Sequence, residues 1–569
     1  TQHAVLFNLQ GSMRLSLSVL GAACSSSPPY PRSQAPVQSI FVVSSGSRSS
    51  AELLCLDTLA GNVARDSPVL YRVAGSGWAT DEGDSYSVWL RNIQHEHPNV
   101  TVDSSLLDAP LTSILSHFRP SVSSCLRSAG QDASTSAAIT LAAAGEGYLV
   151  VDDDATEAAA KSLGLKCQDL RGETVSRVLT DEVIGNLSTR VIVFQDPKKS
   201  QFLADYAIFA RAPALQYGND TAAQQKLLDR STGVGVCLGW GPENEYVTTC
   251  NQHGKYVHAS DFNTNLALLS NTEPEAAAPQ SAVDAPAPAQ ADYHSTGTAA
   301  GTAEQGDWRK QRKERGSAGH GGGSVHTVTF LMTDGDNLQW TLGPWATNPQ
   351  WFGGSRGEVP MGWTFCPAAA MLAPSAAHAV MSNLTDQDEL VAGPSGAGYA
   401  YPKAFPKGLL GDLNDLTTEG MKMSNMSLLN VIAQNDDEPD LDLLGEFITP
   451  AIGMIFYGFG NGYCNHKGKL WWIGDKPVVS GRYSLWGNGT SGRMLGVDAL
   501  VAKLAEQAKT PESADGYSVI PVHAWTHSYA DVVAVAEGLK KYEGVEVVKP
   551  SELIAQIQAN VSPASSVFI

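Results

Sequence analysis

The sequence predicts an α/β protein with two domains, an N-terminal domain built on a parallel sheet at residues 36–214 and an irregular (β/α) barrel-like domain at residues 215–569. Three observations predict this fold class. Short β-branched apolar runs alternate with amphipathic stretches of helical length, which is the pattern of βαβ units. The length of 569 residues exceeds that of one ordinary domain. Residues 272–323 interrupt the alternation with a different composition.

In the N-terminal domain, runs such as IFVVS and RVIVFQD are rich in β-branched residues and predict strands. The expected strands lie at residues 40–44, 69–73, 99–102, 148–154 and 190–196. The helical stretches between them lie at residues 51–65, 86–94, 155–163, 174–187 and 200–212. No strand-to-helix turn carries a glycine-rich phosphate motif, so a nucleotide site is not expected. The aspartates at 152–154 end a strand and are expected to form a solvated turn and helix cap rather than a cation site.

The same alternation continues in the second domain. Its expected strands lie at residues 233–238, 325–333, 362–365, 389–392, 428–433, 453–457, 477–481, 517–522 and 545–548. Its most evident helices lie at residues 376–381, 497–507, 530–542 and 551–559. Repeated strand–helix units fit a (β/α) barrel better than an antiparallel sandwich.

Residues 272–323 consist largely of Ala, Pro, Gln, Gly and charged residues. Such a segment cannot bury enough apolar area to offset its ordering entropy, so a disordered insertion within the second domain is expected. The basic run at 309–315 lies inside it and is expected to be solvated. The formal charge of -20 argues against a general nucleic-acid binder.

Residues 1–35 are expected to form a leader or disordered end, in which Arg14 precedes an apolar run and then small residues, as in a secretion signal. No apolar run reaches the roughly 18 residues that span a bilayer. Asn-X-Ser/Thr sequons occur at Asn99, Asn186, Asn219, Asn383, Asn425, Asn488 and Asn560. A secreted or lumenal glycoprotein is therefore expected.

The eight cysteines contain no CxxC pair, which disfavours a zinc knuckle or a thioredoxin-like site. In an oxidising compartment Cys237 and Cys250 could close a short loop around residues 240–245. Cys55 lies on the apolar stripe of an expected helix and is predicted to be a buried thiol.

Polar and aromatic residues follow many of the expected barrel strands, at the end where barrel enzymes carry their reactive groups. Asp334-Gly335-Asp336-Asn337 follows the strand VTFLM, and its two carboxylates could orient a sugar, act as acid and base, or hold a metal. The alternative is an Asp-rich turn that caps the next helix. Residues 435–438 could likewise be a surface acidic loop.

His523 and His527 are four residues apart, a spacing that places both on one helix face, as zinc ligands require. The glutamate of an HExxH motif is absent, which removes the zincin interpretation. A structural role for the pair is the alternative.

The segment Gly396-Ala397-Gly398-Tyr399-Ala400-Tyr401-Pro402 combines flexible glycines, a rigid proline and two tyrosines, as suits an aromatic loop that grips a polyhydroxylated ring rather than fills a core. It reads GxGYxYP without a mismatch and resembles the family named after that motif. Further resemblance is carried by residues 56–71, 236–245, 330–340, 356–367 and 522–529. The resemblance implies a glycoside hydrolase with an α/β N-terminal domain and a carbohydrate substrate.

Hydrolysis of a glycosidic bond needs one carboxylic acid and one carboxylate as base or nucleophile. We predict Asp336 and Asp436 as this pair, with Asp334 orienting its partner and His523 donating hydrogen bonds. Arg482 could bind an anionic substituent such as a uronate, or be a structural partner of an aspartate. The expected substrate-binding residues are Trp240, Glu243, Asn337, Ser395, Tyr399, Tyr401, Arg482, Trp486 and His527.

Two alternatives remain open at the level of sequence. A metal-dependent polysaccharide deacetylase would hold a divalent metal with Asp334 or Asp336 and the two histidines, whereas the hydrolase needs no cofactor. A non-catalytic carbohydrate-binding extracellular glycoprotein would keep the aromatic cleft without turnover.

Overall fold

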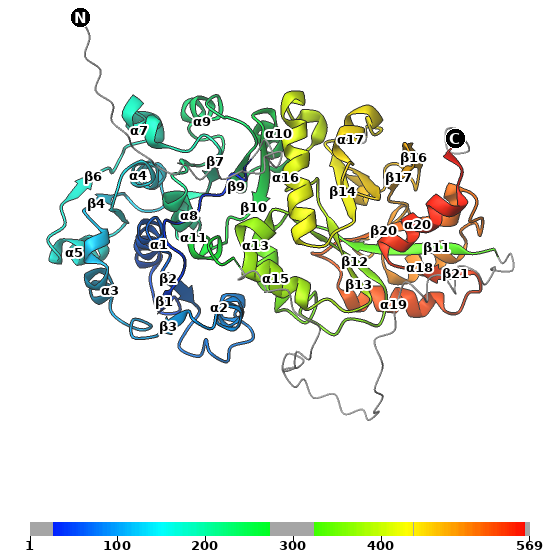
Figure 1. The fold of residues 1–569 in the computed structure, drawn as a ribbon, viewed down its shortest axis with the longest axis horizontal. Helices are drawn as coiled ribbons and strands as arrows, with labels where there is room; N and C mark the ends of the chain where they lie inside the picture. Colours follow the sequence, from blue (N-terminus) through cyan, green and yellow to red (C-terminus); the bar gives the residue numbers. More distant parts are fainter. Residues whose placement is uncertain (1–26, 274–323, 436, 564–569) are drawn as a thin grey trace, which may run out of the picture.

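The computed structural model describes residues 27–273, 324–435 and 437–563. Within the expected leader, residues 1–26 lie outside the described part of the chain, as do residues 274–323 of the expected insertion. The chain folds as a mixed α/β protein with parallel sheets in its N-terminal half and a curled half-barrel sheet in its C-terminal half, which confirms the predicted fold class (Figure 1).

The first N-terminal sheet has the strand order β2-β1-β3 and is parallel. Its strands are β1 (Ser39–Ser44), β2 (Leu70–Val73) and β3 (Thr101–Asp103). The connecting helices are α1 (Ser50–Ala64), α2 (Ser85–Glu96) and α3 (Leu111–His117). Ser49 and Glu52 form a capping box at the start of α1, which fixes where the helix begins. Cys55 in α1 is a buried free thiol, as predicted.

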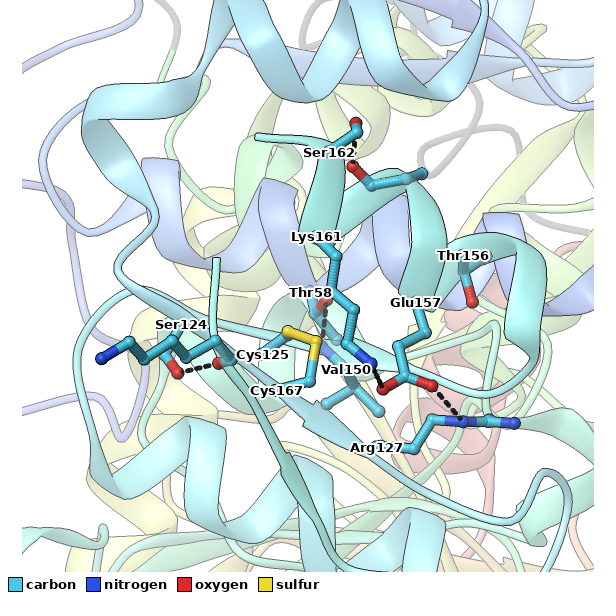
Figure 2. Close-up of a disulfide and its surroundings, with 12 residues drawn as sticks. Thr58, Ser124, Cys125, Arg127, Val150, Thr156, Glu157, Lys161, Ser162 and Cys167 are labelled. Atoms are coloured by element: carbon cyan, nitrogen blue, oxygen red, sulfur yellow. Dashed lines mark hydrogen bonds and ion pairs between the residues drawn. A yellow bond between two sulfur atoms is a disulfide. The ribbon is translucent and has the colours of Figure 1, made fainter. Parts of the chain in front are cut away.

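The second sheet, with strand order β5-β4-β6, carries a disulfide between Cys125 and Cys167 (Figure 2). Its elements are β4 (Ser124–Arg127), α4 (Ala133–Ala144), β5 (Tyr148–Val151), α5 (Asp154–Ser162), β6 (Cys167–Asp169), α6 (Val175–Val178) and α7 (Asp181–Asn186). The Asp153 carboxylate accepts from the Thr156 N–H and caps α5, which confirms the expected helix cap. The disulfide considered possible between Cys237 and Cys250 is not formed, because both are buried free thiols.

The third sheet has the order β10-β9-β7-β8. Its elements are β7 (Val191–Phe194), α8 (Ala204–Phe209), β8 (Ala214–Leu215), α9 (Thr221–Leu228), β9 (Gly235–Gly239), α10 (Glu243–Gln252), β10 (Lys255–Ala259) and α11 (Leu266–Leu269). Placing the strand expected at 233–238 in the barrel is wrong, since β9 pairs with β7 and β10. A domain boundary after residue 214 would divide this sheet, so we propose to group residues 215–271 with the preceding strands.

The curled sheet arranges its parallel strands largely in chain order, with β20 beside β11. These strands are β11 (His326–Met332), β12 (Met361–Phe365), β13 (Asp388–Ala392), β14 (Leu428–Ala433), β15 (Gly453–Gly458), β17 (Lys476–Ser480) and β20 (Tyr517–Val522). A bridge between Gly481 and Val519 brings the residue after β17 beside β20, so the sheet curls toward closure. Smaller strands extend it, namely β16 (Leu470–Ile473), β18 (Ser484–Leu485), β19 (Met494–Leu495) and β21 (Val545–Val547).

Helices cover the outside of the curled sheet. They are α13 (Leu338–Thr341), α14 (Ala369–Leu372), α15 (Pro374–Ser382), α16 (Leu410–Met423), α17 (Leu441–Phe447), α18 (Val497–Ala505), α19 (Tyr529–Leu539) and α20 (Pro550–Asn560). Figure 1 shows the third N-terminal sheet, with β10 and α10, facing α13 and α16 at the middle of the molecule. Of the described helices, none is long and apolar enough to cross a membrane.

Candidate functional site

A pocket of about 280 Å³ lies where the third sheet meets the carboxyl ends of the curled sheet. Residues that follow β9, β11, β13 and β20, together with residues of β14 and β15 and the segment after it, line this pocket. It is lined by Trp240, Glu243, Thr333, Asp334, Asp336, Asn337, Gln339, Pro394, Tyr399, Asn430, Ile432, Tyr457, Tyr463 and Trp525. The structure therefore brings together six of the residues singled out from sequence, which are Trp240, Glu243, Asp334, Asp336, Asn337 and Tyr399.

The turn after β11 is held in one conformation by close packing. A Cβ on Gly335 would lie 2.2 Å from the Thr364 carbonyl carbon, so only glycine fits there. The Gly335 N–H donates to the Thr364 hydroxyl at 2.9 Å, and the Thr333 hydroxyl donates to Asp334 at 2.7 Å. Asn337 precedes α13 but makes no capping hydrogen bond with its side chain. The turn thus presents its carboxylates to the pocket rather than serving as a side-chain cap of this helix.

Burial shapes the electrostatics of the site. Desolvation raises the pKa of Asp334 to about 6, with a smaller contribution from the charge of Glu243. Desolvation, together with the charges of Asp334 and Glu243, raises the pKa of Asp336 well above its usual range. Among the lining residues in the described part of the chain, there is no Lys, Arg or His to offset these charges. Burial and mutual repulsion therefore favour the protonated form of these carboxyls, most strongly that of Asp336.

Glu243 enters the pocket from α10, at the start of that helix. The Tyr399 hydroxyl donates to Glu243 Oε1 at 2.8 Å and lies 3.1 Å from the Tyr401 hydroxyl. Burial raises the pKa of Glu243, and the hydrogen bond from Tyr399 opposes that rise. The Trp240 indole stacks on Tyr399, with ring centroids 6.4 Å apart. These contacts orient the one carboxylate of the pocket that comes from the third sheet.

The GxGYxYP loop joins the curled sheet to β10. Tyr399 and Val257 exchange two main-chain hydrogen bonds of 2.9 Å each. A Cβ on Gly398 would lie 2.6 Å from the Tyr256 ring and 3.0 Å from the Val257 carbonyl oxygen, so the close approach requires glycine here. The Tyr401 N–H donates to the Asn251 side chain at 2.7 Å. Of the two tyrosines expected to grip a ring, Tyr399 lines the pocket, whereas Tyr401 is fully buried and does not.

His523 and Trp486 lie behind the pocket lining. Their rings stack with centroids 3.7 Å apart, and Trp486 packs edge-on against Tyr463, which does line the pocket. His523 Nδ1 lies 2.8 Å from the Thr526 hydroxyl. Burial, with a contribution from His527, lowers the pKa of His523 to about 4, so its imidazole is neutral at physiological pH.

His527 is occupied by other partners. Its Nε2 lies 2.8 Å from the Gly487 carbonyl oxygen and its Nδ1 lies 3.3 Å from Asp531. Across the described ranges, no three His, Cys, Asp or Glu side chains are grouped so as to hold a metal ion. The Asp–His–His metal site that a deacetylase requires is therefore not formed by Asp334 or Asp336 with these histidines.

Two other predicted residues, Ser395 and Arg482, do not line the pocket. Ser395 is buried, and its hydroxyl accepts from the Ile432 N–H at 2.9 Å. Arg482 donates to the carbonyl oxygens of Tyr517 and Ala514 at 3.0 and 2.9 Å, a structural role within the sheet. Asp436 lies outside the described residues.

Several residues of the pocket wall are not among those predicted from the sequence. Tyr457 and Tyr463 stack nearly parallel, with ring centroids 5.1 Å apart. Trp525, which lies between His523 and His527 in the sequence, also lines the pocket. Tyr457 stands at the end of an expected strand, so the rule that found the other residues could have found it. Asn430 lies inside β14 and has no comparable signal in the sequence.

These features define an α/β protein with a half-barrel sheet and a carboxylate-rich, aromatic-walled pocket at its strand ends. Three family domains match the sequence: "GxGYxYP_N 1st domain" at residues 39–120, "GxGYxYP third domain" at residues 189–271 and "GxGYxYP putative glycoside hydrolase C-terminal domain" at residues 324–558. The chain belongs to the GxGYxYP family.

Among solved structures, the chain is similar to a crystal structure described as that of a putative hydrolase from Bacteroides thetaiotaomicron. The two are 22% identical, with a TM-score of 0.73, over 93% of this chain and 96% of the other. This similarity shows a shared fold across nearly the whole chain. No curated protein matches the sequence.

We predict that Gly398→Ala destabilises the protein by about 1–3 kcal/mol, because the added methyl group overlaps Tyr256 and the Val257 carbonyl oxygen. Chemical denaturation measures this change. Gly408→Ala is the matched control, since a Cβ there meets nothing within 4 Å, and its effect should stay within about 0.5 kcal/mol. Equal stability of the two variants would contradict the close docking of the loop on β10.

The raised pKa of Asp334 predicts a pH-dependent cost to stability. The folded state holds this proton up to about pH 6, whereas the unfolded chain releases it near pH 3.8, so the stability loss develops between these values and is complete above pH 6. Asp334→Asn should therefore be more stable than wild type by about 1–3 kcal/mol at pH 8 and equal to it at pH 3.5. Urea unfolding at both pH values measures this, and a difference that is the same at both would contradict it. Asp437→Asn, at an exposed carboxylate, should match wild type throughout.

Proposed function

We propose that this protein is a glycoside hydrolase whose acid and base are Asp336 and Glu243. The observation that carries the proposal is the pocket itself, where Glu243, Asp334 and Asp336 lie among aromatic rings and no described lining residue is basic. Hydrolysis of a glycosidic bond needs two carboxyl groups with different pKa values, so that one is protonated and the other ionised. The family to which the chain belongs is described in the same terms.

The environments of the two groups suggest their roles. Asp336 is buried next to Asp334 and Glu243, which favours its protonated form and suits it to donate to the leaving oxygen as general acid. Glu243 accepts a hydrogen bond from Tyr399, which favours its ionised form. The ionised carboxylate can act as the base that activates a water molecule or as the nucleophile that attacks the anomeric carbon. Asp334 helps to keep Asp336 protonated. In this assignment Glu243 takes the place that the sequence analysis gave to Asp436.

The aromatic wall suits a carbohydrate. Trp240, Tyr399, Tyr457 and Tyr463 all line the pocket, and an aromatic face packs well on the apolar face of a sugar ring. Asn337 has a buried side-chain oxygen that no hydrogen bond satisfies among the described residues, which leaves it available to a sugar hydroxyl.

We also propose that the protein is secreted or lumenal and glycosylated. All seven sequon asparagines are exposed, as an oligosaccharide acceptor must be, at positions 99, 186, 219, 383, 425, 488 and 560. The disulfide between Cys125 and Cys167 is of the kind that persists in an oxidising compartment.

Asp336→Asn tests the proposed reaction. The amide cannot protonate the leaving oxygen, so kcat should fall about 10²- to 10⁴-fold on any polysaccharide from which wild type releases reducing ends. Affinity for the same glycan, measured by calorimetry, should remain within severalfold. Asp437→Asn, at an exposed carboxylate, is the control and should retain full activity. A wild-type protein that binds glycans without releasing any reducing end would instead support the non-catalytic alternative.

The hydrogen bond from Tyr399 predicts a shift in the pH profile. Tyr399→Phe removes this donor, so the pKa of Glu243 rises and the acidic limb of kcat/KM against pH should move to higher pH. Tyr401→Phe, which keeps the bond between Tyr399 and Glu243, should move that limb less. An unchanged acidic limb in Tyr399→Phe would contradict the role of Glu243 as the ionised partner.

A further inference from the structure

An exposed indole stands at the mouth of the pocket. Trp525 follows β20 and lines the pocket, yet 49% of its surface is open to solvent. Its loop is firmly held, because the Trp351 indole N–H donates to the Ala524 carbonyl oxygen at 3.0 Å and Trp340 packs 5.5 Å from Trp525 between centroids. A large apolar ring that is held in place and left uncovered next to a pocket is typical of a ligand-binding surface.

A second exposed ring reaches the same rim from the third sheet. Phe262 follows β10 and is 49% exposed. Its N–H donates to the Gln339 side chain at 3.1 Å, and Gln339 lines the pocket. The Lys199 ammonium lies 3.9 Å from the centre of this ring. Aromatic surface therefore continues from the pocket on both sides of the junction between the two sheets.

The charge of the pocket limits what it can accept. Glu243, Asp334 and Asp336 line it, and no Lys, Arg or His from residues 27–273, 324–435 or 437–563 does so. Arg482, which the sequence analysis offered to an anionic substituent, is held by main-chain carbonyl oxygens instead. A uronate or sulfate group inside the pocket would face carboxylates without a counter-charge.

The size of the pocket limits it as well. Its volume of about 280 Å³ is below the usual range for pockets that enclose a drug-sized ligand, about 300–1,000 Å³. A single sugar unit suits such a volume, and any further unit must lie outside, where Trp525 stands.

We propose that the substrate is an uncharged oligosaccharide, with one sugar unit in the pocket and the next unit stacked on Trp525. Phe262 extends the contact for longer chains. The chemical step in this proposal rests on the proposed hydrolase function, but the binding subsite at Trp525 does not depend on turnover.

The test compares Trp525→Ala with Trp525→Phe and Tyr542→Ala. Tyr542 is 44% exposed and does not line the pocket, so it is a matched control for loss of an exposed ring. The substrates are disaccharides and longer oligosaccharides of the gluco, xylo and manno series, 4-nitrophenyl glycosides of the same sugars, and galacturonate oligosaccharides. Thermal unfolding of each variant verifies that it is folded.

Trp525→Ala should lower kcat/KM on the best neutral oligosaccharide by about tenfold or more, as expected for loss of a stacking contact. Trp525→Phe should keep most of the activity, and Tyr542→Ala should keep all of it. The 4-nitrophenyl glycoside of the same sugar should lose less than the oligosaccharide, and galacturonate oligosaccharides should be the poorest substrates. An equal loss on short and long substrates, or better use of galacturonate chains, would overturn the subsite.

Calorimetry in an Asp336→Asn background separates this proposal from the proposed function. If wild type hydrolyses nothing but the neutral oligosaccharides bind more weakly to Trp525→Ala, the hydrolase function fails and the subsite stands. If turnover is found and affinity is the same with and without Trp525, the subsite fails and the hydrolase function stands. If no neutral oligosaccharide binds, the subsite proposal is wrong.

Discussion

The two main-chain hydrogen bonds between Val257 and Tyr399 are the constraint on which the rest of the site depends. They attach the GxGYxYP loop of the curled sheet to β10 of the third sheet, and Gly398 permits the close approach. The same loop then presents the Tyr399 hydroxyl to Glu243, while β11 presents Asp334 and Asp336 from the opposite wall. The GxGYxYP segment thus connects the two sheets and brings their residues together in one site.

The cluster of carboxyl groups in the pocket lowers the stability of the folded protein, which is a feature of functional sites. Holding buried Asp336 beside half-buried Asp334 and Glu243 costs free energy at neutral pH, and the described lining residues include no basic side chain that would offset this cost. Other buried charges of the chain form ion pairs, such as Arg72 with Asp57 and Arg356 with Asp388. An unpaired cluster in a pocket is the kind of perturbation that marks reactive sites, because it keeps one carboxyl protonated beside an ionised one.

Periodicity in the sequence predicts the fold class and most strands of the curled sheet, because β-branched runs and strand-end polarity are local signals. It does not predict that β9 pairs with β7, since strand pairing depends on contacts that are remote in the chain. Polar and aromatic residues directly after the strands predict about half of the candidate site, including Glu243, although its strand belongs to a different sheet from the one expected. Arg482 donates to main-chain carbonyl oxygens and lies 3.5 Å from Asp515, which is the structural alternative that the sequence left open, and Tyr401 is buried. Sequence alone does not distinguish such a side chain from one that faces a ligand.

The central claim is that Glu243 and Asp336, brought from separate sheets, titrate as one unit. A double-mutant cycle of Glu243→Gln and Asp336→Asn, read as free energy of unfolding at pH 8, tests it most directly. Each carboxyl raises the free-energy cost of holding the other in the pocket, either as repulsion or as forced protonation. We therefore expect the double variant to gain less than the sum of the two single gains, with a coupling of about 0.5–3 kcal/mol that vanishes at low pH. Strict additivity at pH 8 would contradict the account.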